Sequence, residues 1–207
     1  AVGKLIDLRP DLLLLGGDFV SIDPAAARRL ARLLTTIDAR FGRFAVLGNH
    51  DYWAGAPVVV RHLEDAGIQM LTNRAINLPS PFECISICGL DDHTSGEPDA
   101  EQAFSGAGEF RVVLMHAPSG LLDIGDEAFS VAICGHTHGG QIALPSGRPV
   151  VVASGPLSRE YNAGRYSLPA DRTLLVSRGV GCGTLPMRWN PPSAVLLCSI
   201  NTGADSR

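Results

Sequence analysis

Residues that could bind a metal ion follow four short apolar segments of the sequence, each just beyond the point where the segment ends. Residues 12–15, 44–47, 111–115 and 131–134 are runs of the length and composition typical of buried strands. The residues with ligand-type side chains that come after them are Asp18, Asn49, His50, Asp51, His116, His136 and His138. Because loops beyond the carboxyl ends of strands converge at one edge of an α/β sheet, we expect these side chains to form a single site.

The chemical types of these side chains favour a divalent transition metal. Carboxylate, amide oxygen and imidazole together suit Mn, Fe or Zn better than a structural zinc cage, which normally uses thiolates. Gly17, Gly48 and Gly135 stand directly before the candidate ligands of three segments. Glycine lets the backbone approach closely where several loops surround one ion.

Each candidate also has an ordinary explanation when taken alone. His116 could be a hydrogen-bonded histidine at a loop, Asn49 is common in turns, and Asp51 could cap the segment that leads into Tyr52 and Trp53. These two aromatic residues could line a substrate channel or pack under the loop. The joint occurrence of ligand types at successive strand ends is what favours a site.

Two further groups of residues have alternative interpretations. His93 follows the Asp91-Asp92 pair and could border a substrate entrance or belong to an exposed polar loop. Arg159 and Arg165, with Tyr161 between them, could bind a second phosphate group, since arginine pairs well with phosphate oxygens, or could be solvated loop residues.

The elements that must position the candidates alternate between helix and strand in the first half of the chain. Asp23 and Pro24 are an N-cap and a first-turn proline, which predicts a helix to about Arg40 whose buried face carries Leu30, Leu33, Leu34 and Ile37. A second helix is predicted over residues 57–66, and a surface helix or loop over 97–108. Further strands are predicted over 68–71, 76–78, 84–90, 150–153, 174–177 and 194–200. This order predicts an α/β layered fold in one domain, residues 1–207.

Composition excludes several classes of protein. The 207 residues include 17 basic and 21 acidic side chains, a formal net charge of −4, without the basic excess of a nucleic-acid-binding surface. No apolar stretch approaches the roughly 20 residues of a transmembrane helix. The five cysteines have no paired spacing, so we expect free thiols in a reducing compartment, with Cys84 and Cys88 buried in a strand.

The motifs together resemble those of a known family. Gly17-Asp18, Gly48-Asn49-His50-Asp51, Met115-His116-Ala117-Pro118 and Gly135-His136-Thr137-His138 are similar, in this order, to four of the five signatures of the calcineurin-like metallophosphoesterases. Residues 139–142, 177–181 and 191–192 resemble the bacterial branch of small phosphodiesterases. The resemblance implies a layered α-β-β-α sandwich with mixed sheets.

The resemblance also implies a centre with two divalent ions. Asp18 would bridge both ions, Asn49, His116 and His136 would complete the site of one, and His138 would bind the other. A hydroxide that bridges the ions would attack phosphorus, and the ions would stabilise the attacking and leaving oxygens. Their identity, Mn, Fe or Zn, is left open.

Two further roles and two departures come with the resemblance. His50 would face the phosphate and protonate the leaving oxygen, and Asp51 would hold the loop or a ligand imidazole in place. The family's first signature, Asp-x-His, is absent, since Asp7 is followed by Leu and Arg. We therefore expect that the chain lacks its N-terminal strand and first motif. Ser21 replaces an acidic residue that many relatives carry.

The predicted function is metal-dependent hydrolysis of a phosphodiester, phosphomonoester or pyrophosphate bond in a small phosphorylated substrate, nucleotide- or lipid-linked. One alternative is an impaired homologue that binds a metal or a phosphate without turnover. Another is a mononuclear zinc hydrolase that acts on non-phosphate bonds. We expect the protein in the cytoplasm, or at the periphery of the inner membrane.

Overall fold

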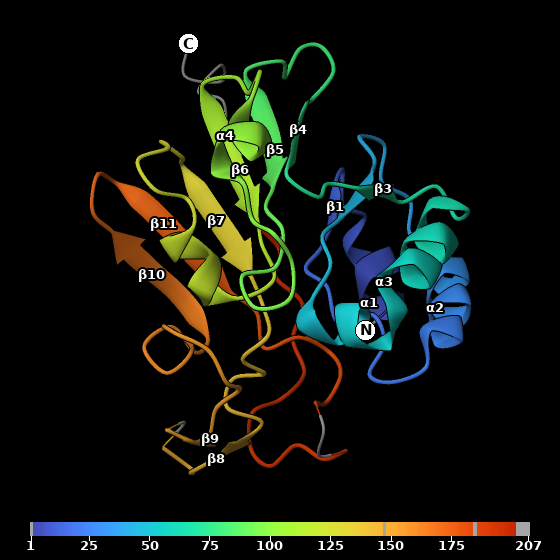
Figure 1. The fold of residues 1–207 in the computed structure, drawn as a ribbon, viewed down its shortest axis with the longest axis vertical. Coiled ribbons are helices and arrows are strands. Elements are labelled where there is room, and N and C mark those ends of the chain that lie inside the picture. The colour runs from blue at the N-terminus through green and yellow to red at the C-terminus, as the bar shows by residue number, and fades with distance from the viewer. Residues whose placement is uncertain (1, 147, 184–185, 202–207) are drawn as a thin grey trace.

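The computed structural model describes residues 2–146, 148–183 and 186–201, and it places two sheets face to face (Figure 1). The first sheet is parallel and has three strands in the order β1-β2-β3. They are β1 (Leu13–Leu15), β2 (Arg43–Ala45) and β3 (Gln69–Met70). The second sheet is mixed, with the order β10-β11-β7-β6-β5-β4. Its strands are β4 (Arg74–Asn77), β5 (Ile85–Gly89), β6 (Phe110–Leu114), β7 (Val131–Cys134), β10 (Gly164–Leu168) and β11 (Arg172–Val176).

Helices cover the outer faces of the two sheets. The helices beside the three-stranded sheet lie on the right of Figure 1 and are α1 (Val2–Leu8), α2 (Ala27–Leu34) and α3 (Asn49–Glu64), with the 3₁₀ turn η1 (Pro24–Ala26) leading into α2. On the six-stranded sheet lie α4 (Ala100–Phe104) and the 3₁₀ segment η2 (Pro118–Leu122). A small antiparallel hairpin, β8 (Ile142–Ala143) with β9 (Pro149–Val151), extends at the bottom of Figure 1.

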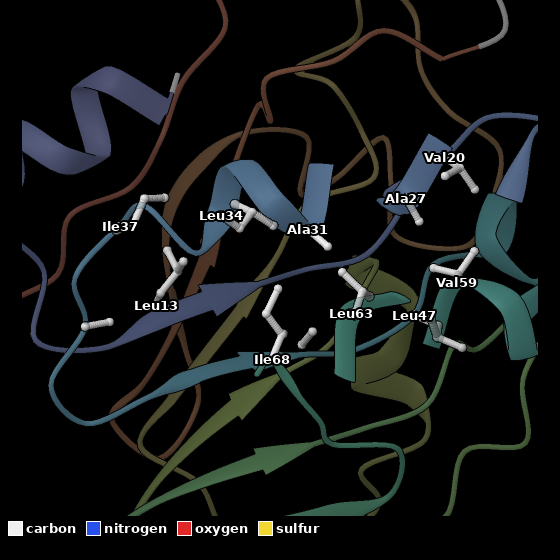
Figure 2. Close-up of a cluster of buried hydrophobic side chains, with 12 residues drawn as sticks. Leu13, Val20, Ala27, Ala31, Leu34, Ile37, Leu47, Val59, Leu63 and Ile68 are labelled. Atoms are coloured by element: carbon white, nitrogen blue, oxygen red, sulfur yellow. The ribbon is translucent and has the colours of Figure 1, made fainter. Parts of the chain in front are cut away.

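Side chains that alternate along the strands fill three separate apolar layers. In β2 and just beyond it, Ala45 and Leu47 face the helices, in the cluster that Figure 2 shows, whereas Phe44 and Val46 face the other sheet. In β6 the same alternation sends Val112 to the layer between the sheets and Val113 to the layer under α4 and η2. This period of two is what a strand buried on both faces requires. The predicted α-β-β-α sandwich with mixed sheets is therefore confirmed.

The end of the first predicted helix was wrong. The helix α2 ends at Leu34, not near Arg40, because the hydroxyls of Thr35 and Thr36 donate to the carbonyls of the last turn at 2.8 and 2.7 Å. Such side-chain bonds compete with further helical hydrogen bonds. Its buried residues are Ala27, Ala31 and Leu34, whereas Leu33, predicted to be buried, is 46% exposed.

Other boundaries differ from the sequence prediction in ways that affect the site. The second helix, α3, begins at Asn49 rather than near residue 57, and a kink at Gly55, where φ is 130°, separates its first turns from the rest. Residues 194–200 form no strand, although they are apolar. Cys84 is exposed just before β5, whereas Cys88 is buried, so only one of the two predicted buried thiols is confirmed.

The strand β10 and the helix α1 were not predicted. Within the described residues, no helix has both the length and the apolar character needed to cross a bilayer. The expectation of one domain that lacks its first strand stays a prediction.

Candidate metal centre

Four of the predicted ligands lie together where strands of both sheets end. Asp18 follows β1, Asn49 is the first residue of α3 after β2, and His116 and His136 follow β6 and β7. In each sheet these strands are parallel, so their carboxyl ends lie at one edge of that sheet. The two edges meet where His116 contacts Asn49. Among the described residues, the ligand atoms of Asp18, His116 and His136 lie within 4.8 Å of one another.

The donor atoms converge on Nε2 of His116. This nitrogen lies 3.1 Å from Oδ1 of Asn49, 3.0 Å from Nδ1 of His136 and 3.4 Å from Oδ2 of Asp18. Asn49 and His116 are buried, and Asp18 and His136 are half-buried. The four side chains, here called the four-ligand cluster, therefore present two nitrogens and two oxygens to one shielded point.

Backbone carbonyls fix which nitrogen of each imidazole faces the cluster. His116 donates from Nδ1 to the carbonyl of Gly16 at 2.7 Å, and His136 donates from Nε2 to the carbonyl of Ser154 at 2.8 Å. A carbonyl oxygen can only accept, so in the neutral rings both inward nitrogens, 3.0 Å apart, carry lone pairs. Only a proton or a cation between them makes this contact favourable. This second hydrogen bond to a carbonyl is also the usual arrangement of metal-binding histidines.

Burial and charge shift the pKa values of three side chains in the cluster. Burial alone would lower the pKa of His116, but the hydrogen bond to Asp18, its negative charge and the Gly16 carbonyl together raise it. Burial raises the pKa of Asp18, yet the interactions with His116 and His50 outweigh this effect, and the net pKa is lowered. For His136, burial and the charge of His116 lower the pKa. The charge of Asp18 thus favours a positive charge on His116, and a charge on His116 disfavours a second one on His136.

Tight backbone packing surrounds the cluster. A Cβ atom on Gly48 would lie 2.3 Å from Oδ1 of Asp18 and 2.5 Å from Cε1 of His116, and a Cβ on Gly17 would lie 2.5 Å from the nitrogen of Gly48. Asp18 and His136 have positive φ angles of 56° and 66°, which non-glycine residues rarely adopt. Such strain persists only where the surrounding structure holds it, and it is common at functional sites.

Asp51 ties together the two loops that carry Asp18 and Asn49. Its carboxylate accepts from the backbone N–H groups of Asp18 at 2.8 Å, Gly48 at 3.0 Å and Val20 at 3.2 Å, and the side chain is fully buried. Burial raises the pKa of Asp51, and the three N–H groups only partly oppose this. The predicted role of holding the loop therefore has a physical basis in these contacts, which are all to backbone N–H groups.

The His50 ring is not part of the four-ligand cluster. Its backbone N–H donates to Oδ1 of Asp18 at 3.0 Å, while Nδ1 of its ring lies 3.3 Å from the carbonyl oxygen of Ser21. The ring is half-buried, and the centroid of the exposed Trp53 indole lies 4.9 Å from its own. Because the contact to position 21 uses the backbone carbonyl, it does not need the acidic side chain that Ser21 replaces.

His138 does not belong to the four-ligand cluster. Arg188 donates from Nη2 to Nδ1 of His138 at 3.0 Å and from Nη1 to its carbonyl at 3.0 Å, and it also donates to the carbonyls of Arg178 and Gly181. Burial and the charge of Arg188 lower the pKa of His138. Sequence reasoning missed Arg188, because it lies 50 residues from its partner and belongs to none of the motifs that contain ligands.

The remaining candidates lie outside the cluster. His93 pairs with Asp123 at 2.7 Å, Tyr52 is half-buried and packs against the helix-side core, and Trp53 is exposed. Arg159 and Arg165 are both exposed. A residue that sequence reasoning gave little weight is Asp92, which is buried and whose negative charge acts to raise the pKa of both His116 and His136.

Comparison with known sequences identifies a matching family and related proteins. The sequence model of the calcineurin-like phosphoesterase family matches residues 1–140. Phosphodiesterase YaeI of Escherichia coli (strain K12) is 32% identical over 87% of this chain and 67% of its own length. The uncharacterized metallophosphoesterase YkuE of Bacillus subtilis (strain 168) is 31% identical over 87% of this chain. The chain spans only 64% of YkuE.

A more distant sequence match and a solved structure with a similar fold were also found. UDP-2,3-diacylglucosamine pyrophosphatase LpxG of Chlamydia muridarum (strain MoPn / Nigg) is 24% identical over 94% of this chain and 75% of its own length. The structure of the NAD nucleotidase NadN of Haemophilus influenzae superposes with a TM-score of 0.55 and 18% identity, over 86% of this chain and 38% of that one. The extent of the family match and the identity to YaeI show that the chain belongs to the calcineurin-like phosphoesterase family.

Proposed function

We propose that the chain hydrolyses a phosphodiester or pyrophosphate bond of a small substrate, with a divalent metal ion held by Asp18, Asn49, His116 and His136. The observation that carries this proposal is the contact of 3.0 Å between the inward nitrogens of His116 and His136, both of which direct their other N–H to a carbonyl. The amide oxygen of Asn49 and the carboxylate of Asp18 complete a mixed N/O donor set that fits Mn, Fe or Zn.

A divalent ion in this position supplies polarisation of a phosphoryl oxygen and activation of water for attack on phosphorus. The residues of the chain have separate tasks around it. The N–H of His50 and the carboxylate of Asp51 fix the side chain and backbone of Asp18, respectively. The His50 ring, which is half-buried and outside the cluster, stabilises negative charge on the phosphate and protonates the leaving oxygen.

We also propose a second ion beside Asp18 and His138, which binds more weakly than the first. The guanidinium of Arg188 can only donate, so Nδ1 of His138 accepts and the neutral ring carries its proton on Nε2. Coordination through either ring nitrogen therefore requires the contact with Arg188 to break. This contact also favours the impaired homologue, which binds one metal ion without turnover, as the second candidate.

The proposed substrate class, nucleotide- or lipid-linked phosphates, is supported by the printed functions of two relatives, a phosphodiesterase and a UDP-2,3-diacylglucosamine pyrophosphatase. The proposed cytoplasmic location is supported by the five cysteines, all of which are free thiols.

The purified chain, reconstituted with Mn²⁺ and assayed with bis-p-nitrophenyl phosphate, tests the proposal. We expect turnover that EDTA abolishes and that excess Mn²⁺ restores. Bound metal close to one equivalent without turnover would instead support the impaired homologue. Hydrolysis of p-nitrophenyl acetate with the diester untouched would support a hydrolase of non-phosphate bonds.

A further inference from the structure

The four-ligand cluster is shared between the two sheets, so its geometry depends on how the two halves of the molecule are held together at this edge. Asp18 and Asn49 follow strands of the three-stranded sheet, and His116 and His136 follow strands of the six-stranded sheet. The layer between the sheets is apolar, and hydrophobic packing is not directional. Accurate alignment of the ligands therefore requires a directional contact close to the site.

The Tyr52 side chain makes such a contact. Tyr52 follows Asp51 in the first turns of α3, and its hydroxyl donates to Oδ1 of Asp91 at 2.5 Å, across 39 residues of sequence. Asp91 lies two residues beyond the end of β5, a strand of the six-stranded sheet. The hydrogen bond thus joins the turn that carries Asn49, His50 and Asp51 to the sheet that carries the two histidines.

The acceptor is itself rigidly held. Asp91 is 6% exposed, and its carboxylate also accepts from the backbone N–H groups of Asp92 at 2.8 Å and Glu97 at 3.0 Å. Its own N–H donates to Oδ1 of Asn73 at 3.0 Å. Gly96 packs so closely that a Cβ there would lie 2.4 Å from Cγ of Asp91. The carboxylate therefore cannot rotate freely.

The donor is equally well defined. The ring of Tyr52 packs against the core between the helices and the three-stranded sheet. Its hydroxyl reaches Asp91 beside the six-stranded sheet. Burial and the adjacent carboxylate of Asp91 raise the pKa of Tyr52, so the hydroxyl stays protonated and continues to donate.

We propose that Tyr52 and Asp91 are a positioning pair that aligns the Asn49–His50–Asp51 turn with His116 and His136. Neither residue belongs to the four-ligand cluster, and the pair acts through the residues that it aligns. Its expected effect on metal affinity rests on the proposed function. Its expected effect on the geometry of the two imidazoles does not.

The test is Tyr52→Phe, which keeps the ring in the core and removes only the hydroxyl. Tyr166→Phe is the matched control, because the hydroxyl of Tyr166, on β10, bonds to the backbone of Ala163, the residue just before the same strand. We expect Tyr52→Phe to weaken Mn²⁺ binding, measured by calorimetry, by about 10-fold or more, as removal of residues that orient metal ligands does. We expect Tyr166→Phe to bind Mn²⁺ as the wild type does.

A second measurement needs no metal. Spectra of the histidine ring nitrogens by NMR, recorded on the metal-free proteins, should show changed signals of His116 and His136 in Tyr52→Phe and unchanged signals in Tyr166→Phe. If the wild type itself binds no Mn²⁺, the proposed function fails, and these spectra alone decide on the positioning pair. Unchanged ring signals in Tyr52→Phe would overturn the pair. If the wild type binds Mn²⁺, an unchanged Mn²⁺ affinity in Tyr52→Phe would also overturn it, even if this variant had a lower melting temperature.

A double-mutant cycle tests whether the two residues act as one unit. Asp91→Asn should weaken Mn²⁺ binding in the wild-type background and cause little further loss in the Tyr52→Phe background. Additive losses would overturn the pair, because they would mean that each residue acts separately.

Discussion

The imidazole of His116 and the side-chain amide of Asn49 meet at the boundary between the two sheets, with Nε2 of the one 3.1 Å from Oδ1 of the other. Asn49 follows β2 of the three-stranded sheet, and His116 follows β6 of the six-stranded sheet. The candidate centre therefore forms only where the two halves of the sandwich meet. Metal affinity consequently reports on the packing of the whole domain as well as on the individual ligands.

Removal of a ligand should weaken metal binding strongly. We expect His136→Ala and Asn49→Ala to weaken Mn²⁺ binding by more than about 100-fold, since even residues that only orient ligands contribute 10- to 100-fold. Calorimetric titration measures this loss. His62→Ala, on α3 and outside the cluster, is the control and should bind Mn²⁺ normally. Normal affinity in both ligand variants would contradict the assignment.

His50 should affect turnover but not metal binding. Its ring contacts the Ser21 carbonyl and Trp53, and it lies outside the four-ligand cluster. We expect His50→Ala to lower kcat for bis-p-nitrophenyl phosphate by about 10²- to 10⁴-fold, the usual contribution of acid catalysis. Elemental analysis should show unchanged metal content. If the variant loses its metal together with its activity, His50 is a ligand and the proposed role is wrong.

Asp51 should matter for stability even in the metal-free protein. Asp51→Ala leaves three backbone N–H groups without their acceptor, and we expect a loss of about 3 kcal/mol in the free energy of unfolding, about 1 kcal/mol for each bond. Urea denaturation in EDTA measures it. Asp99→Ala, which removes the exposed N-cap of α4, is the control and should cost about 1 kcal/mol. Equal losses in the two variants would show that Asp51 does not hold the loops together.

Gly48 should tolerate no side chain. A Cβ there would lie 2.3 Å from Oδ1 of Asp18 and 2.5 Å from Cε1 of His116, so Gly48→Ala must displace two ligands. We expect loss of measurable Mn²⁺ binding. A Cβ on Gly3, in α1, would meet nothing within 4 Å, so Gly3→Ala should bind Mn²⁺ normally. Full affinity in Gly48→Ala would mean that the loops move freely, and that the cluster is less rigid than the structure indicates.

The convergence of the ligands within each sheet was predictable because it follows from chain direction. Parallel strands end at the same edge of a sheet, so the ends of β1 and β2 lie together, as do those of β6 and β7. That the two pairs belong to different sheets whose edges meet at the site does not follow from chain direction. The layered α/β fold was predictable from the order of helices and strands, and the α-β-β-α sandwich was implied by the family resemblance. Only the pairing of strand ends within each sheet needs no more than local sequence and the geometry of a parallel sheet.

The details of the site depend on contacts between distant residues. The carbonyl of Gly16 accepts from Nδ1 of His116, 100 residues away, and so fixes which ring nitrogen faces the cluster. Arg188 donates to Nδ1 of His138, 50 residues away. No local pattern encodes either contact. The same holds for the end of α2, where two threonine hydroxyls outweighed an apolar periodicity that continued to Ile37.

The most direct test of the central claim is metal content per chain after reconstitution with Mn²⁺ and gel filtration, compared between the wild type and His136→Ala, with hydrolysis of bis-p-nitrophenyl phosphate measured on the same samples. The proposed centre predicts at least one tightly bound ion and turnover in the wild type, with loss of both in the variant. Equal metal content and equal turnover in the two proteins would contradict it, because the ion and the activity would then lie elsewhere.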